Sequence, residues 1–97
     1  MQKIVWLESA VNDLVRLRQF IAKKNPAAAK NAADSIRSAV KLLSKNSEIG
    51  KPVSDLAPYR DLHARFGVGG YIIRYRVYSD VVYIVHVRHY RENDFKS

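Results

Sequence analysis

The sequence predicts an α+β domain in which two helices pack on one face of a mainly antiparallel sheet. Residues 71–91 alternate apolar and polar side chains on both sides of a central turn, as two antiparallel strands with one buried face do. Residues 10–21 and 29–43 carry apolar side chains at helical spacing, and residues 3–7 are β-prone. The predicted order is therefore an N-terminal strand, a helical hairpin and a three-stranded antiparallel meander.

The first strand is expected at residues 3–7 (KIVWL), with a helix beginning at once behind it. Ser9 is the predicted N-cap, because its hydroxyl can accept from free N–H groups of the first turn. The buried stripe of this helix is expected at positions four, three and four residues apart, namely Ala10, Leu14, Leu17 and Ile21.

The junction between the two helices is expected at Asn25 and Pro26, with Asn25 as N-cap and Pro26 as the first helical residue. The second helix is expected over about residues 27–45, and the short connection predicts an antiparallel helical hairpin. We expect this half of the chain to pack against the sheet and to take no part in catalysis. Its buried stripe is expected to consist of Ala29, Ala32, Ala33, Ile36, Val40 and Leu43.

Residues 46–59 contain glycine and two prolines and predict an irregular connection, long enough to be functional. Residues 60–66 alternate again, which predicts a strand. Residues 67–70 (GVGG) are expected to form a tight glycine turn, and the polar tail after Arg91 to be frayed apart from Phe95. In the strand, Leu62, Ala64 and Phe66 are expected inward and Asp61, His63 and Arg65 outward.

The last two strands are expected to meet at a turn formed by Ser79 and Asp80. Strict alternation assigns odd-numbered residues to the core and even-numbered residues to the other face. The expected core row is Tyr71, Ile73, Tyr75, Val77, Tyr83, Val85 and Val87. The expected opposite face carries Arg74, Arg76, His86 and Arg88.

The composition limits the class of protein. With 97 residues the chain is expected to form one domain, residues 1–97. It has no cysteine and no apolar run near the roughly 20 residues of a membrane span, and its N-terminus resembles no signal peptide. We expect a protein of a bacterial or other reducing cytoplasm that does not act at a membrane. Its net charge of +8 favours nucleic acid, an acidic protein or an anionic surface as partner.

Three histidines, His63, His86 and His89, are the candidates for chemistry. No cysteine or HExxH motif accompanies them, so no metal site and no cofactor are expected. A histidine beside arginines could cleave RNA by general acid–base catalysis. Arginines on an open sheet face could equally confer solubility or bind an acidic partner, and spacing alone favours this second interpretation. The neighbouring arginines are Arg60, Arg65, Arg74, Arg76, Arg88 and Arg91.

Tyrosines interleaved with arginines are typical of surfaces that stack on nucleobases. Three of the six tyrosines are expected in the core row, which weakens this signal. The tyrosines expected at the surface are Tyr59, Tyr78 and Tyr90.

The ordered motifs resemble the RelE/ParE superfamily of type II toxin–antitoxin toxins over nearly the whole chain. They are WLESAVNDLVRLRQFIAKKNPAAA (residues 6–29), IGKPV (49–53), YRDLH (59–63) and YIIRYRVYSDVVYIVHVRHYR (71–91). The resemblance implies the fold predicted above. It also implies a small, basic cytoplasmic toxin that an acidic-leaning antitoxin neutralises, the antitoxin being the usual DNA-binding partner. No sequence-specific DNA binding is therefore expected of this chain alone.

Two activities divide the superfamily. RelE-like toxins cut mRNA in the ribosomal A site, often with a C-terminal tyrosine, whereas ParE-like toxins inhibit DNA gyrase without catalysis of their own. The NPAAA junction and the YIIRYRV strand resemble the ParE branch, also called plasmid stabilisation proteins. Phe95 stands in the tail where a RelE-like toxin would offer a tyrosine, and phenylalanine has no hydroxyl for acid–base chemistry.

The resemblance implies three hypotheses. The first is a gyrase inhibitor, not an enzyme, with a ParD-like antitoxin. The second is a ribosome-dependent endoribonuclease in which Arg60 and Arg88 hold phosphate and His89 or Tyr90 moves the proton. The third is a family member that is no longer toxic. The target contacts expected under the first hypothesis are Arg60, Arg74, Arg76, Arg88, His89, Tyr90 and Arg91.

Overall fold

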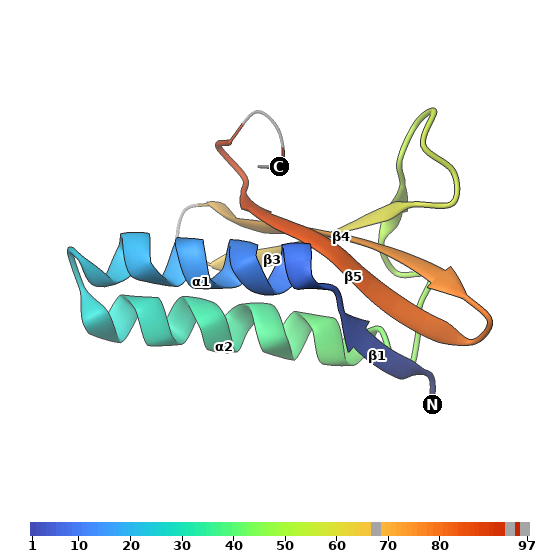
Figure 1. Cartoon of the computed structure of the whole chain (residues 1–97), viewed down its shortest axis with the longest axis horizontal. Coiled ribbons are helices and arrows are strands. Elements are labelled where there is room, and N and C mark those ends of the chain that lie inside the picture. Colours follow the sequence, from blue (N-terminus) through green and yellow to red (C-terminus); the bar gives the residue numbers. More distant parts are fainter. Residues whose placement is uncertain (67–68, 93–94, 96–97) are drawn as a thin grey trace.

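The computed structural model describes residues 1–66, 69–92 and 95. These residues form two helices and one sheet of five strands in the order β1-β5-β4-β3-β2 (Figure 1). Strand β1 runs parallel to β5, and the other neighbours are antiparallel. The elements are β1 (Lys3–Trp6), α1 (Glu8–Ala22), α2 (Pro26–Leu42), β2 (Lys51–Pro52), β3 (Arg60–Phe66), β4 (Gly69–Tyr78) and β5 (Val81–His89).

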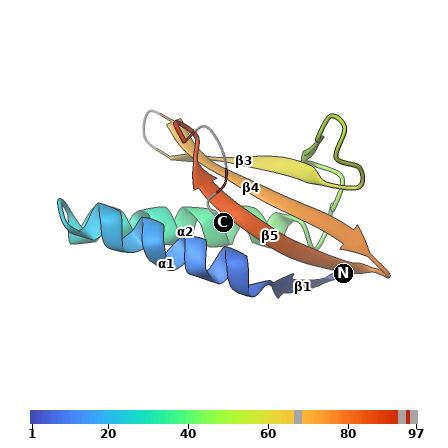
Figure 2. The ribbon, with the colours of Figure 1, turned by 45° about the horizontal axis from the view of Figure 1, so that its top comes forward.

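The predicted fold class is confirmed. Figures 1 and 2 show α1 and α2 side by side on the same face of the sheet, which leaves the other face open. The fifth strand, β2, was not predicted. It consists of only two residues, one of them a proline, and pairs with the start of β3, where the sequence pattern indicated a loop.

The helix ends agree with the sequence at α2 and differ at α1. Asn25 caps α2, because its side-chain oxygen accepts the N–H of Ala28 at 3.1 Å, and Pro26 is the first helical residue. The prediction that Ser9 caps α1 is wrong. The helix begins at Glu8, so Ser9 already lies inside the first turn, and its hydroxyl donates instead to the carbonyl of Val85 on β5 at 2.6 Å.

The core lies between the helical hairpin and the sheet. Both predicted helical stripes are buried, although Leu14 and Ile21 are only partly so. From the sheet, Tyr71, Ile73 and Tyr75 of β4 fill its centre, with at most 3% of each side chain exposed. In β3, Ala64 is buried, and Leu62 and Phe66 pack against the core as predicted.

A β-bulge corrects the predicted core row of β5. Arg74 lies opposite His86, but the next residue, Tyr75, lies opposite Ile84, so Val85 is the extra residue of the bulge. One extra residue reverses which parity faces inward. The fully buried side chains of β5 are therefore Val82, Ile84 and Val87. The prediction that Tyr83 and Val85 belong to the core row is wrong.

The turn between β4 and β5 is the one predicted. Ser79 and Asp80 have φ angles of 50° and 68°, the left-handed pair that a two-residue type I′ hairpin needs. Of the predicted glycine turn, residues 67 and 68 lie outside the described residues, and Gly69 and Gly70 begin β4. Gly70 has a φ of 125°, and a Cβ there would lie 2.2 Å from the Ala64 carbonyl oxygen, so only glycine fits.

No helix in the described part of the chain is long and apolar enough to cross a membrane.

Candidate target-binding face

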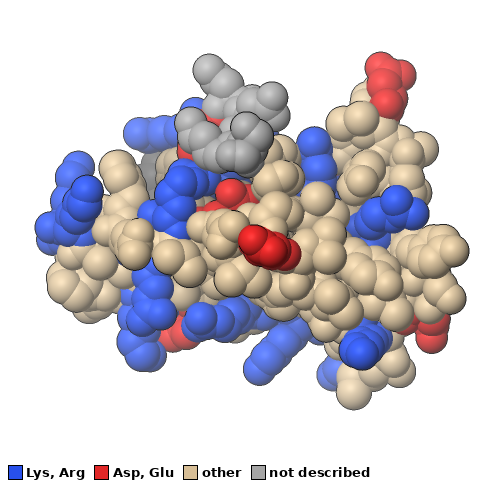
Figure 3. Space-filling view, viewed as in Figure 1, with Lys and Arg blue, Asp and Glu red and all other residues tan. Residues whose placement is uncertain are grey.

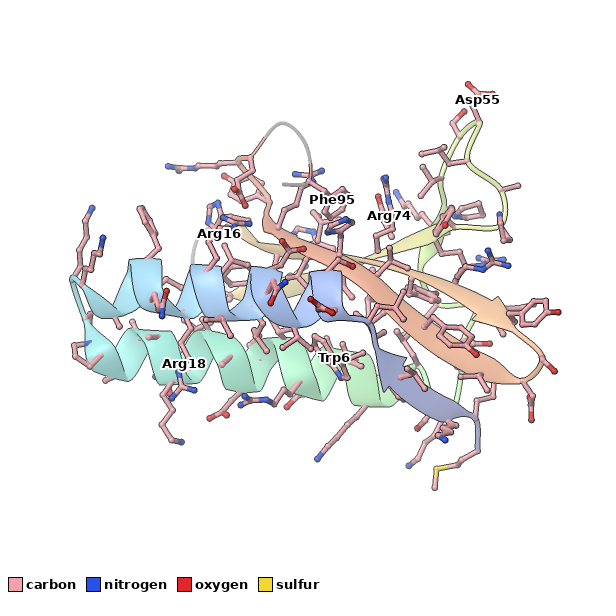
Figure 4. All side chains as sticks on the ribbon, in the orientation of Figure 1. Trp6, Arg16, Arg18, Asp55, Arg74 and Phe95 are labelled. Atoms are coloured by element: carbon pink, nitrogen blue, oxygen red, sulfur yellow. The ribbon has the colours of Figure 1, made fainter. Side chains whose placement is uncertain are left out.

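The open face of the sheet carries three of the seven predicted target contacts, Arg74, Arg76 and Arg88. Three rows of side chains cross it: Asp61, Arg74 and His86 in the first, His63, Ile72 and Arg88 in the second, and Arg76 with Tyr83 in the third. Figure 4 shows Arg74 and Phe95 on this side, away from the helices. A hollow of about 590 Å³ lies on the same face, between the β3–β4 surface and the segment around β2, and Lys51, His63, Arg65 and Arg88 are among its lining residues.

Arg74 is held by a carboxylate. Its Nε and one terminal nitrogen donate to the two carboxylate oxygens of Asp61 at 2.9 and 3.0 Å, and both side chains are largely buried. Such a bidentate pair compensates the charge of the guanidinium. The ring of Phe95 lies 4.5 Å from the guanidinium carbon on the same face. Arg74 therefore positions the tail residue.

Arg88 is held by the chain end that follows it. One terminal nitrogen donates to the carbonyls of His89, Tyr90 and Glu92, the last at 2.5 Å. Phe95 covers this guanidinium too, at 5.2 Å, and stacks on the ring of His86 at 5.5 Å. Phe95 therefore gathers three of the residues that the sequence placed on this face.

Arg60 anchors the long connection between α2 and β3. It donates to the carbonyls of Gly50 and Glu48 at 2.8 and 3.3 Å. The buried hydroxyl of Tyr75 joins the same anchor, because it donates to the Ser47 carbonyl and accepts the Gly50 N–H. Burial raises the pKa of Tyr75 above its ordinary value. The structure thus brings Arg60 to the loop and away from Arg88.

His89, Tyr90 and Arg91 lie together where β5 ends. The ring of His89 meets Tyr71 edge-on at 5.5 Å, and its backbone N–H donates to a carboxylate oxygen of Glu92. Tyr90 stacks near His63 at 6.4 Å, and its hydroxyl accepts from Arg91 Nε at 3.3 Å. That hydrogen bond raises the pKa of Arg91 above its ordinary value. These three residues form a cluster separate from Arg76.

Arg76 stands at the other end of the face. Its guanidinium lies 5.8 Å from the ring of Tyr59 and 5.7 Å from that of Tyr78. Arg76 makes no hydrogen bond or ion pair with any described residue, although its Nε is buried. Among the predicted target contacts, it is the arginine that has no hydrogen bond or ion pair with a described residue.

Asp13, for which the sequence pattern indicated no role, holds α1 to β5. Its carboxylate is buried, with 4% of the residue exposed. One oxygen accepts the Val87 N–H at 2.9 Å and lies 2.7 Å from Nδ1 of His86. The other oxygen lies 3.9 Å from a terminal nitrogen of Arg16. The sequence did contain one sign of this role, because Asp13 is an acidic residue on the same helical face as the buried Ala10 and Leu17.

Metal coordination has no support from these contacts. Among residues 1–66, 69–92 and 95, no three or more histidine or carboxylate side chains come together in a way that could hold a metal ion. The histidines on the open face are paired instead with aromatic rings, with Asp13 or with backbone carbonyls.

The chain is similar to toxins of type II toxin–antitoxin systems. The family model for the ParE toxin of the type II system parDE matches residues 4–94. Toxin RelE3 of Caulobacter vibrioides is 39% identical over 80 residues, which cover 82% of this chain and 85% of that protein. Toxin RelE2 of the same organism is 34% identical over 89 residues, which cover 92% and 96%.

A solved structure has the same fold. The chromosomal ParDE toxin–antitoxin system from P. aeruginosa contains a chain that superimposes with a TM-score of 0.76 at 23% identity, covering 92% of this chain and 96% of that one. The family match spans nearly the whole chain, and two relatives and the fold agree with it. The chain therefore belongs to the ParE toxin family of type II toxin–antitoxin systems, within the RelE/ParE superfamily.

Proposed function

We propose that this toxin inhibits DNA gyrase by binding it, without covalent chemistry of its own. The observation that carries the proposal is the bonding of Arg60 and Arg88, the two arginines that would hold phosphate in a ribonuclease. Both donate to backbone carbonyls of this chain. A guanidinium already bonded in this way is a poor clamp for a transition-state phosphate, because those bonds would have to break first. Phe95, which has no hydroxyl, covers Arg88.

A RelE-like, ribosome-dependent mRNA endoribonuclease is the second candidate. The observation that favours it is the 2.7 Å contact between Nδ1 of His86 and the carboxylate of Asp13. A carboxylate that orients an imidazole in this way is the arrangement that acid–base histidines use. In that function Arg60 and Arg88 would release their carbonyls and hold phosphate, and His86 would join His89 and Tyr90 as a candidate for proton transfer.

A gyrase supercoiling assay with purified, antitoxin-free toxin tests the first candidate. Inhibition together with accumulated cleaved DNA is the expected result. Unaffected gyrase, from a folded preparation that stops growth when induced in a bacterial host, refutes the proposal and favours mRNA cleavage. Unimpaired growth at confirmed expression refutes both activities and favours a toxin that has lost its function.

The antitoxin is expected to be ParD-like, acidic-leaning and present in the same bacterial cytoplasm. We propose that it lays a helix or an extended segment across the helical hairpin and the sheet edge. Leu7, Val11 and Val15 lie four residues apart at α1 and are 37%, 43% and 49% exposed, so they offer an unpartnered apolar stripe. A complex held mainly by such burial weakens little with salt. A steep rise of the dissociation constant between low and high salt refutes this placement.

A further inference from the structure

Arg76 has no hydrogen-bond or ion-pair partner in the part of the chain that the structure describes. Its guanidinium lies between the rings of Tyr59 and Tyr78, at 5.8 and 5.7 Å. Its Nε is buried, so the side chain lies along the protein surface and does not extend freely into solvent. Cation–π contacts of this kind orient a guanidinium and leave its terminal N–H groups available to an acceptor.

The arginines nearest to it in the sheet already have hydrogen-bond acceptors within this chain. Arg74, two residues away on β4, is paired with Asp61, and Arg60, beside Tyr59, donates to the carbonyls of Glu48 and Gly50. Among the described residues at this end of the face, Arg76 is therefore the arginine whose guanidinium has no acceptor within the chain. A nucleic-acid site needs a series of cations that follows successive phosphates, so this arrangement fits a single carboxylate better. Figure 3 likewise shows lysines and arginines spread over the visible surface and not gathered in one patch.

A cup with a partly apolar lining adjoins the arginine. It has a volume of about 410 Å³, and Tyr59 belongs to both the cup and the cation–π contact. Its apolar side includes Val53, Pro58, Tyr59 and Val77, and Ser47, Glu48 and Arg60 line its polar side. Tyr78, which is 63% exposed, borders the site on the other side. Arginine and tyrosine beside an apolar pocket are the residue types that dominate the binding energy of protein–protein interfaces.

Hydrogen bonds within the loop and to the sheet support the loop that forms the cup. The Val53 N–H donates to the Tyr59 carbonyl, and the Tyr59 N–H donates to the Leu56 carbonyl at 2.8 Å. Arg60 and the hydroxyl of Tyr75 bind the base of the same loop. Figure 4 shows its tip, Asp55, projecting beyond the open face. A loop that is already ordered loses little conformational entropy when a ligand binds, so the cup is suited to binding a partner.

We propose that Arg76 and the adjacent cup form the recognition site for the protein target of this toxin. The site takes a segment that presents an aspartate or glutamate carboxylate to Arg76 and an apolar side chain to the cup. The net charge of +8 favours such an acidic partner. This inference rests on the proposed function only in assuming that the toxin acts by binding a protein.

The first test uses the toxin and purified gyrase. Arg76→Ala and Tyr78→Ala are expected to weaken binding at least tenfold, and Arg76→Lys to weaken it less. Arg37→Ala, which removes an exposed arginine on α2, is the matched control and should stay within twofold. Thermal unfolding of each variant shows that it is folded. Wild-type affinity in folded Arg76→Ala overturns the site.

A second readout separates this inference from the choice of gyrase. If the wild-type toxin does not bind gyrase, the proposed function fails, and the same variants are scored by growth inhibition on induction. Folded Arg76→Ala that no longer inhibits growth supports the site, and full inhibition overturns it. Binding to a labelled single-stranded oligouridine is measured as well. If Arg76→Ala loses this binding and keeps gyrase binding unchanged, the site is also overturned, because its ligand would then be nucleic acid.

A third readout needs no toxicity. Titration of the toxin with the blocked dipeptide N-acetyl-leucyl-glutamate amide is expected to shift the NMR signal of the Arg76 Nε–H. The glutamine analogue, which keeps the leucine and lacks the charge, is the matched probe. Equal shifts with both dipeptides, or no shift with either, overturn the assignment of a carboxylate to Arg76.

Discussion

Replacing Asp13 with alanine tests how α1 is held to the sheet. The substitution removes the acceptor of the Val87 N–H, the partner of His86 Nδ1 and a carboxylate near Arg16. Removing one side of a buried charged network costs about 3–5 kcal/mol, because the remaining polar groups stay buried without partners. A chain of this length has a total stability of about 5–15 kcal/mol, so the loss is a large fraction of it.

The measurement is thermal unfolding followed by circular dichroism. A loss of about 3 kcal/mol lowers the Tm of a domain of this size by about 12–24 °C. Asp13→Asn is expected to cost only about 1 kcal/mol, because an amide oxygen in the place of the shared carboxylate oxygen can still accept from the Val87 N–H and from Nδ1–H of His86. The amide nitrogen then replaces the other oxygen, whose contact with Arg16 is the longer one at 3.9 Å.

Asp34→Ala is the matched control for Asp13→Ala. Asp34 forms exposed ion pairs with Lys30 and Arg37, so its loss should change stability by less than about 1 kcal/mol. If Asp13→Ala costs no more than Asp34→Ala, the buried carboxylate does not hold α1 to β5, and the reasoning is wrong.

Four further outcomes are expected. Tyr75→Phe should cost about 1–3 kcal/mol in urea unfolding, because the Gly50 N–H loses its buried acceptor, and an unchanged midpoint contradicts this. Asp80→Gly should stabilise the chain by about 1 kcal/mol in the same assay, because residue 80 has a φ of 68°, which glycine adopts without strain. A loss of stability would show that contacts of the aspartate side chain outweigh the relief of backbone strain. The free energy of unfolding should fall as the pH rises above about 10, the ordinary pKa of tyrosine, because burial raises the pKa of Tyr75 in the folded chain and so favours its neutral form. A free energy of unfolding that stays constant above that pH contradicts the raised pKa. His89→Ala and Tyr90→Phe should retain most growth inhibition if the toxin is a binder, and complete loss of inhibition in folded protein supports the ribonuclease.

Local chemistry explains why much of the fold could be predicted. The N-cap at Asn25 followed by Pro26, the left-handed turn at Ser79 and Asp80, and the alanine-rich stripe of α2 depend on neighbours within a few residues. Each is an effect of backbone conformation or side-chain spacing that acts before distant segments meet. The family resemblance was readable for a similar reason, since its motifs occur in order along nearly the whole chain.

The tertiary structure decided the features that depend on distant partners. The bulge at Val85 reverses the parity of β5 and moves Tyr83 out of the core, because strand register is set by pairing with β4 and not by local alternation. Ser9 and Asp13 bond to residues more than 70 positions away, so their roles have no local signature. The same holds for the arginines of the open face. The fold class, the helical hairpin and the basic face could all be predicted from residue patterns. Which arginine lacks a hydrogen-bond acceptor depends on contacts that form only in the folded chain. The acceptors of Arg60, Arg74 and Arg88 lie on other segments or at the chain end, whereas Arg76 contacts two tyrosine rings.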